Sequence, residues 1–158
     1  DIYYKLKQRG IKEKLYFIGN GEKVELIKQK IKEYKLEDDV ILLGQIENPY
    51  PFFKNAKLFV HTAKYEGLPT VLLESLVFGT PVVAYDCPTG PKDILGKNSE
   101  YGELIPLNDK DTFVKKVDEL VNNSEKYENY KKMSLIRASD FSMEINKLKL
   151  KKLIEKNK

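Results

Sequence analysis

Two glutamates, Glu66 and Glu74, lie on either side of the beginning of a predicted helix. A carboxylate can accept hydrogen bonds from two neighbouring hydroxyls, and each hydrogen bond to a charged group contributes about 1.5–3 kcal/mol. Vicinal hydroxyls are what a ribose and a hexose present, so the pair is a candidate sugar site. Spacing alone favours the alternative, in which both are surface glutamates and one of them stabilises the helix dipole.

The helix between these glutamates begins without an obvious cap. Pro69 suits the first helical position, which makes Leu68 the N-cap, and a leucine side chain accepts no hydrogen bond. The amides of residues 70–72 are then unpaired, and with the helix dipole they form an anion site that a pyrophosphate can fill. A cap from a neighbouring loop or from water is the alternative, and local chemistry alone favours it.

A glycine turn, Gly19-Asn20-Gly21, follows an apolar run and opens another predicted helix. Such a turn lets a ligand approach the backbone closely. It departs from the dinucleotide fingerprint, because Val24 stands where the third glycine belongs and the next strand ends in Gly44 instead of an acid. These departures argue against NAD binding.

Several enzyme classes are excluded by their missing motifs. Gly90 and Gly96-Lys97-Asn98 are one residue too far apart for a P-loop, and no G-x-S-x-G elbow is present. The single cysteine, Cys87, and the single histidine, His61, leave no internal disulfide and no metal cluster, so we predict no metal and no cofactor. As a nucleophile and base they are a weak signal, because a core thiol and a strand-end histidine are far commoner.

Composition predicts one globular domain, with 41% apolar and 33% charged residues in a chain of 158. The charged N-terminus is unlike a signal peptide, and the single cysteine fits a reducing cytoplasm. The net charge of +4 comes from scattered lysines with only two arginines, which predicts no nucleic-acid partner. The lysine-rich tail, residues 147–158, suggests peripheral contact with the inner face of the cell membrane, although a solvated last helix is the favoured alternative.

Short apolar runs alternate with longer amphipathic stretches. This alternation predicts an α/β fold with a single Rossmann-like, doubly wound parallel sheet and helices on both faces. The uniformly apolar runs predict strands buried on both faces. The predicted strands are Leu15–Gly19, Val40–Gly44, Lys57–Thr62, Pro81–Tyr85 and an edge strand at Gly102–Pro106. The predicted helices are Glu22–Tyr34, Tyr50–Ala56, Pro69–Phe78 and two or three between Asp109 and the C-terminus.

Ligands of doubly wound sheets bind at the carboxyl ends of the strands. This rule places the loops after Ile18, Leu43, His61 and Ala84 on one functional rim. Residues 1–10 read as the end of a helix with no strand before it, so we expect the chain to be part of a longer protein.

The segment Glu66-Gly-Leu-Pro-Thr-Val-Leu-Leu-Glu74, followed by Gly79-Thr-Pro-Val-Val-Ala84, resembles the signature of the group 1 (family 4) glycosyltransferases. These are retaining enzymes of the two-Rossmann-domain (GT-B) fold, and their hallmark is two glutamates separated by seven residues. The likeness extends from Leu15 to about Pro106. It implies that residues 1–158 are the C-terminal, nucleotide-sugar-binding domain, truncated at its N-terminus, and that the partner acceptor domain is absent.

The resemblance also implies which residues bind the donor. Glu66 contacts the donor sugar hydroxyls and is the catalytic-site residue of this half, while Glu74 binds the ribose hydroxyls. The remaining positions use their backbone. They lie against the sugar (Gly67 and Leu68), hold the distal phosphate (Thr70 and Val71), meet the nucleobase (Gln45 and Ile46) and form the glycine turn near the nucleotide (Gly19 and Gly21).

The implied activity is metal-independent transfer of a hexose or N-acetylhexosamine from a nucleotide sugar to a glycan or lipid-linked acceptor, in cell-surface polysaccharide synthesis. The loop Asp86–Leu95 resembles a variant found with UDP-linked donors, which favours UDP. An isolated nucleotide-binding module without catalysis and a UDP-sugar epimerase of the same fold remain alternatives.

Two departures from the family pattern suggest that this fragment is inactive alone. The family's Arg and Lys on an opening strand precede this chain, and Lys5, Lys7 and Arg9 lie too far into the following helix to replace them. The family's active-site histidine belongs to the absent domain, and His61 is not its equivalent.

Overall fold

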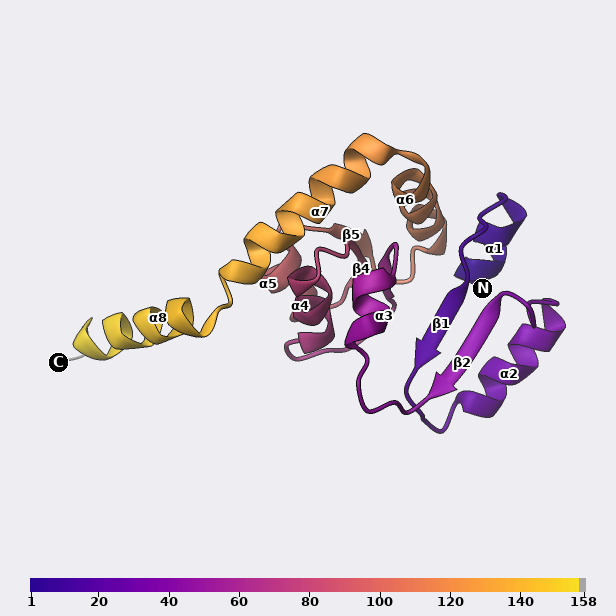
Figure 1. The fold of residues 1–158 in the computed structure, drawn as a ribbon, viewed down its shortest axis with the longest axis horizontal. Coiled ribbons are helices and arrows are strands. Elements are labelled where there is room, and N and C mark those ends of the chain that lie inside the picture. The colour runs from indigo at the N-terminus through magenta and orange to yellow at the C-terminus, as the bar shows by residue number, and fades with distance from the viewer. Residues whose placement is uncertain (157–158) are drawn as a thin grey trace.

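Strands and helices alternate along residues 1–156, the part of the chain that this computed structural model describes (Figure 1). The strands are β1 (Leu15–Ile18), β2 (Val40–Gly44), β3 (Phe59–His61), β4 (Val82–Asp86) and β5 (Glu103–Pro106). The helices are α1 (Ile2–Gln8), α2 (Val24–Glu33), α3 (Tyr50–Asn55), α4 (Thr70–Val77), α5 (Pro91–Leu95), α6 (Lys110–Asn122), α7 (Ser124–Ser139) and α8 (Met143–Lys156). The predicted α/β fold with parallel strands flanked by helices is confirmed.

The strands form two parallel ladders, where the sequence predicts a single sheet. β1 pairs with β2, beginning with Leu15 opposite Val40, and β3, β4 and β5 pair in that order. A doubly wound sheet commonly has the strand order 3-2-1-4-5-6. In that order β2 and β1 correspond to places 3 and 2, and β3, β4 and β5 correspond to places 4, 5 and 6. No strand within residues 1–156 occupies the central place, so the ladders are not hydrogen-bonded to each other.

β4 is the buried centre of the larger ladder. Its side chains alternate between two apolar cores, because successive side chains of a strand point to opposite faces. Val82 and Ala84 pack with side chains of α4 and α5, while Val83 and Tyr85 pack with side chains of α1, β5, α6 and α7. All four are at most 4% exposed, so β4 confirms the predicted burial on both faces.

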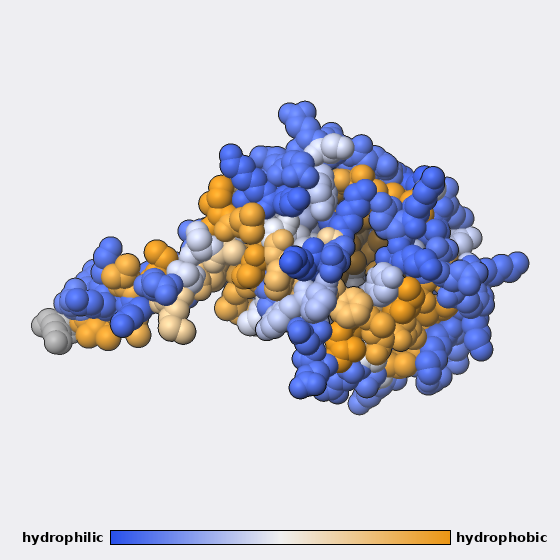
Figure 2. All heavy atoms as spheres, viewed as in Figure 1, coloured by the Kyte–Doolittle hydropathy of each residue, from blue (hydrophilic) through white to orange (hydrophobic). Residues whose placement is uncertain are grey.

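β1 is far more open than its apolar sequence predicts. Tyr16, Phe17 and Ile18 are 40–48% exposed, and Figure 2 shows apolar side chains open over this part of the surface. Helix α2, which follows β1, buries none of its residues. Burial on both faces is therefore wrong for β1, because β1 is paired on one edge only and α2 covers it incompletely.

The start and the end of α4 each differ by one residue from the predicted Pro69–Phe78. The helix begins at Thr70, and Pro69 occupies the N-cap. At the other end Gly79 adopts a φ of +69°, and the amides of Gly79 and Thr80 donate to the carbonyls of Leu76 and Ser75. This is the Schellman arrangement, which satisfies the last carbonyls of a helix and favours glycine.

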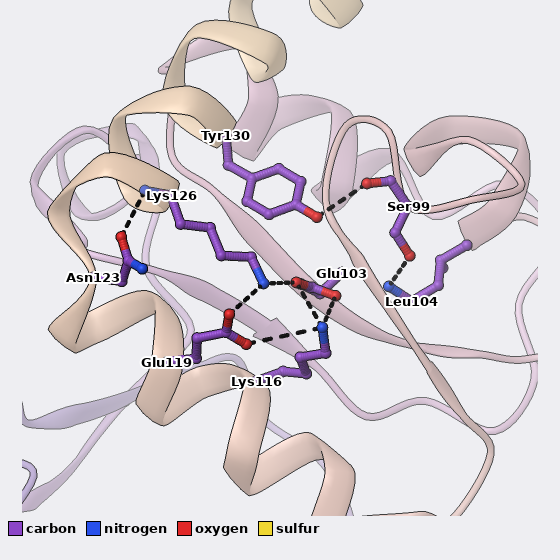
Figure 3. A network of polar contacts seen from close by, with 8 residues as sticks. All are labelled: Ser99, Glu103, Leu104, Lys116, Glu119, Asn123, Lys126 and Tyr130. Carbon is purple, nitrogen blue, oxygen red and sulfur yellow. Dashed lines mark hydrogen bonds and ion pairs between the residues drawn. The ribbon is translucent and has the colours of Figure 1, made fainter.

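A buried ionic network fixes the α6–α7 connection to β5 (Figure 3). The Glu103 side chain is only 5% exposed, and its carboxylate contacts the ammonium groups of Lys126 at 2.6 Å and Lys116 at 3.2 Å. Glu119 shares Lys126 at 3.0 Å. Tyr130 lies beside this network, and burial together with the Glu103 carboxylate raises the pKa of Tyr130 to about 12. A buried carboxylate with two cationic partners avoids the large cost of an unpaired buried charge.

Helix α8 extends away from the body of the molecule (Figure 1). It buries none of its residues, and Figure 2 shows apolar and charged side chains mixed along it. Within residues 1–156 no helix is both long and apolar enough to cross a bilayer. The last two residues of the lysine-rich tail lie outside the described residues, and peripheral membrane contact stays a prediction.

Candidate functional site

The beginning of α4 is the predicted phosphate site. No side chain within residues 1–156 caps this helix. Thr70 and Val71, the first two helical residues, are exposed. The sequence predicted that the amide of Leu72 is also unpaired. This is wrong, because that amide donates to the Pro69 carbonyl at 3.0 Å. The exposed start of α4 therefore offers the Thr70 and Val71 amides, together with the positive end of the helix dipole, to an anion.

Glu66 precedes this helix and is held by the end of β3. Its Oε1 lies 3.1 Å from Nε2 of His61, the last residue of β3. The side chain of His61 is 12% exposed and that of Glu66 is 29% exposed. Burial lowers the pKa of His61, although the nearby Glu66 carboxylate acts in the opposite direction. The contact is therefore best described as a hydrogen bond from a neutral imidazole to a carboxylate.

The loop after β4 supports the backbone on the other side of Glu66. The Thr89 hydroxyl donates a hydrogen bond to the Glu66 carbonyl. Gly90 has a φ of +96°, and a Cβ added there would lie 2.5 Å from the Gly67 carbonyl oxygen and 2.5 Å from Cδ of Pro69. Only glycine fits this approach, since a side chain would have to displace the loop that contains Glu66 and Gly67.

Asp86 and Lys92 connect the end of β4 to α5. The Lys92 ammonium contacts Oδ2 of Asp86 at 3.0 Å. The other oxygen, Oδ1, is buried and has no hydrogen-bond partner within residues 1–156. Burial raises the pKa of the neighbouring Cys87 thiol, which weakens it as a nucleophile. Cys87 and His61 therefore gain no support as a catalytic pair.

Glu74 lies in the second turn of α4, and its carboxylate makes no ion pair or hydrogen bond with residues 1–156. It follows Thr70 and Val71 by four and three residues, so all three share one side of the helix. The structure therefore brings together the second glutamate and the two exposed amides, and it leaves the carboxylate free to accept hydrogen bonds from a ligand.

The predicted nucleotide end lies at the carboxyl ends of β1 and β2. The Gly19 amide donates to the Gly44 carbonyl at 2.7 Å, which joins the two loops. A hollow of about 400 Å³ opens here, and Gly19, Gly21 and Gly44 are among its lining residues. Gln45 is exposed and Ile46 half-buried in the loop after β2, and neither lines the hollow.

The predicted site residues therefore form two groups. One consists of Glu66 and Gly67 with the start of α4, and Leu68 is 54% exposed beside them. The other is the hollow around Gly19 and Gly21. No hydrogen bond or ion pair joins the two groups within residues 1–156. A second hollow of about 420 Å³, lined by Lys54, Lys57 and Lys131 among others, includes none of the predicted site residues.

Sequence reasoning missed the residues that support Glu66. In the sequence, His61 is considered only as a catalytic base or an ordinary strand-end histidine. Gly90 is considered only in a failed P-loop match and, with Thr89, in a donor-type loop. Gly90-Pro91 was the available signal, because a glycine before a proline at a helix start marks a backbone position with special geometry.

Comparisons with known proteins show what this chain is similar to. The family model for glycosyl transferases group 1 matches residues 2–135. The chain is 26% identical over 145 residues to the amylovoran biosynthesis glycosyltransferase AmsD of Erwinia amylovora. This alignment covers 92% of this chain and 40% of AmsD. It is also 33% identical over 110 residues to the poly(ribitol-phosphate) alpha-N-acetylglucosaminyltransferase of Staphylococcus aureus. That alignment covers 70% of this chain and 22% of the S. aureus protein.

A solved structure from S. aureus has the same fold over most of the chain. It is a mutant of TarM in complex with fondaparinux, alpha-GlcNAc-glycerol and UDP, with a TM-score of 0.84 at 26% identity over 90% of this chain and 29% of that chain. This chain thus spans well under half the length of each of these proteins. The family model includes both glutamates, the uncapped start of α4 and the loop that supports Glu66. The chain therefore belongs to the group 1 glycosyltransferase family.

Proposed function

We propose that this chain is the donor-binding half of a retaining glycosyltransferase that uses a UDP-linked hexose or N-acetylhexosamine. The observation behind the proposal is the uncapped start of α4, with one carboxylate held before it and a second, unpaired carboxylate one turn into it. A nucleoside diphosphate sugar offers a phosphate for the amides and vicinal hydroxyls for each carboxylate. The UDP bound in the complex of the S. aureus TarM mutant supports the choice of nucleotide.

In this proposal each site residue has the role that the family resemblance implies. Glu74 accepts hydrogen bonds from the ribose hydroxyls, and the Thr70 and Val71 amides hold the distal phosphate. Glu66 contacts the sugar hydroxyls, while the backbone of Gly67 and Leu68 lies against the sugar. As the bond to the sugar breaks, negative charge grows on the departing diphosphate, and the amides and helix dipole of α4 stabilise that charge.

The nucleobase end of the donor lies near β1 and β2. The Gly19–Gly21 turn lines the hollow there. In this proposal the backbone of Gln45 and Ile46, in the loop after β2, meets the base beside that hollow. Contacts at both ends hold the donor in one orientation, which converts binding energy into positioning of the reacting bond.

Transfer requires an acceptor domain that this chain does not contain. We propose that it lies N-terminal to residue 1 and closes over the donor, that no metal or cofactor takes part, and that residues 1–158 alone are inactive. The whole protein would then act in the cytoplasm, peripheral to the inner face of the membrane, and build a cell-surface polysaccharide on a glycan or lipid-linked acceptor. Domain closure excludes water from the reacting sugar.

Transfer of radiolabelled sugar by the whole protein tests this function. UDP-glucose and UDP-N-acetylglucosamine are supplied with membrane and glycan fractions, and Glu66→Gln serves as the inactive control. Label should enter a lipid-linked or glycan product with the wild-type protein only. UDP binding without transfer to any fraction would instead identify a nucleotide-binding module without catalysis.

A further inference from the structure

His61 is the last residue of β3, and its imidazole is nearly enclosed. The side chain is 12% exposed, and its ring lies near Phe59 with ring centroids 6.3 Å apart. β3 pairs with β4, where His61 is opposite the fully buried Ala84. The backbone that carries the imidazole is therefore hydrogen-bonded to the buried centre of the larger ladder.

The two ring nitrogens of His61 have different surroundings. Nε2 lies 3.1 Å from Oε1 of Glu66. Nδ1 is buried and has no hydrogen-bond partner within residues 1–156. A proton on Nδ1 would be a buried donor without an acceptor, which is costly, whereas a proton on Nε2 donates to a carboxylate. His61 is therefore a neutral imidazole with its single proton on Nε2, which agrees with the lowering of its pKa by burial.

Glu66 is consequently held at two points. The His61 imidazole fixes Oε1 of its side chain, and the Thr89 hydroxyl fixes its backbone carbonyl. A free glutamate side chain has several rotamers, and ordering it upon ligand binding would cost conformational entropy. With Oε1 occupied, the second carboxylate oxygen of Glu66 is the one left for a ligand.

We propose that His61 is a positioning residue that orients the Glu66 carboxylate for the donor sugar and so governs sugar recognition without affecting nucleotide recognition. This inference rests on the proposed function, because it needs the donor sugar to contact Glu66. In the proposed site the nucleotide and phosphate contacts come from α4 and from the ends of β1 and β2, whereas His61 is on β3 and does not line the hollow there. A change at His61 should therefore alter the affinity for a UDP-sugar while the affinity for UDP stays constant.

Two substitutions separate the hydrogen bond from the bulk of the side chain. His61→Met keeps an apolar side chain of similar size and removes the donor, whereas His61→Gln places an amide N–H near the position of Nε2. The dissociation constants of UDP, UDP-glucose and UDP-N-acetylglucosamine are measured by titration calorimetry on the whole protein. The quantity compared is the ratio of UDP affinity to UDP-sugar affinity, together with kcat and KM for transfer.

We expect His61→Met to weaken the binding of the UDP-sugar about ten-fold relative to UDP, because a Glu66 carboxylate that is no longer held must be ordered when the sugar binds. His61→Gln should recover most of that loss. An equal loss for UDP and UDP-sugar would identify a purely structural role and overturn the inference. A ratio of UDP affinity to UDP-sugar affinity that is the same in His61→Met as in the wild type would also overturn the inference.

The inference and the proposed function fail in different ways. A wild-type protein that binds neither UDP nor a UDP-sugar removes the proposed function and the inference with it. If wild type binds the donor but His61→Met does not fold, the ¹⁵N shifts of the wild-type imidazole decide. A proton on Nδ1, or ring shifts that stay the same in Glu66→Ala, would refute the hydrogen bond to Glu66.

Discussion

Replacing Gly90 by alanine should disturb the loop that contains Glu66 and Gly67. The added Cβ would lie 2.5 Å from both the Gly67 carbonyl oxygen and Cδ of Pro69. The backbone φ of +96° adds strain of about 1–3 kcal/mol for a residue with a side chain. Forcing a methyl group into a packed contact costs a further 1–3 kcal/mol or so. The total loss of stability is thus about 2–6 kcal/mol.

Gly10→Ala is the matched control for this substitution. Gly10 has a similar φ of +88°, but a Cβ added there meets no atom within 4 Å. It also lies outside the candidate site, in the turn after α1. Both substitutions restrict the unfolded chain equally, so the difference between them isolates the contact with Gly67 and Pro69. That difference should be about 1–3 kcal/mol.

Thermal unfolding and donor binding together test this reasoning. At about 2–4 °C per kcal/mol for a domain of this size, Gly90→Ala should melt roughly 2–12 °C below Gly10→Ala. Its affinity for a UDP-sugar should also fall, because the backbone of Gly67 would be displaced from the sugar. If both variants melt at the same temperature and bind the donor equally well, the close approach of the two loops is not a feature of the protein.

The other predictions concern the nucleotide and the buried network. Glu74→Ala should weaken UDP binding at least ten-fold in ligand-detected NMR, because each charged hydrogen bond contributes about 1.5–3 kcal/mol, while Glu125→Ala on α7 should change nothing. Lys126→Met leaves Glu103 with Lys116 as its remaining cation and should lower the free energy of unfolding by about 1–3 kcal/mol in urea. Lys132 is exposed, and an equal loss of stability in Lys132→Met would contradict this prediction. The raised pKa of Tyr130, about 12 against about 10 when unfolded, stabilises the fold below pH 10. This stability is lost as the pH rises from about 10 through about 12, and Tyr130→Phe should lessen the fall in melting temperature over that range.

Much of the fold could be predicted because its signals are local. The bounds of β2 agree with the apolar run Val40–Gly44, and both ends of α4 lie within one residue of the predicted Pro69–Phe78. Helix α5 was missed because its five residues are too few to show helical periodicity. The exposure of β1 was not predicted from its apolar sequence. An apolar sequence shows that a strand is able to be buried, but whether it is buried depends on the other elements that pack over it.

The candidate site was predicted only in part, for a related reason. Glu66 and Glu74 were identified from their spacing and from a family resemblance. The hydrogen bond from His61 to Glu66 depends on the path of the four residues between them, which form an irregular loop without periodic pattern. The contact of Gly90 with Gly67 joins two loops from different strands, and no local rule predicts such a pairing.

The separation of the two ladders divides the molecule into parts of unequal local stability. β4 lies between two apolar cores, whereas no residue of β1, α2 or β2 belongs to either of them. Amide hydrogens of β1 and β2 should therefore exchange with deuterium through partial opening, well before those of β4, which need global unfolding. The Gly19–Gly21 turn belongs to the weaker part. A nucleotide bound there would slow exchange in β1 and β2, so that the ligand itself completes the order of this half of the domain.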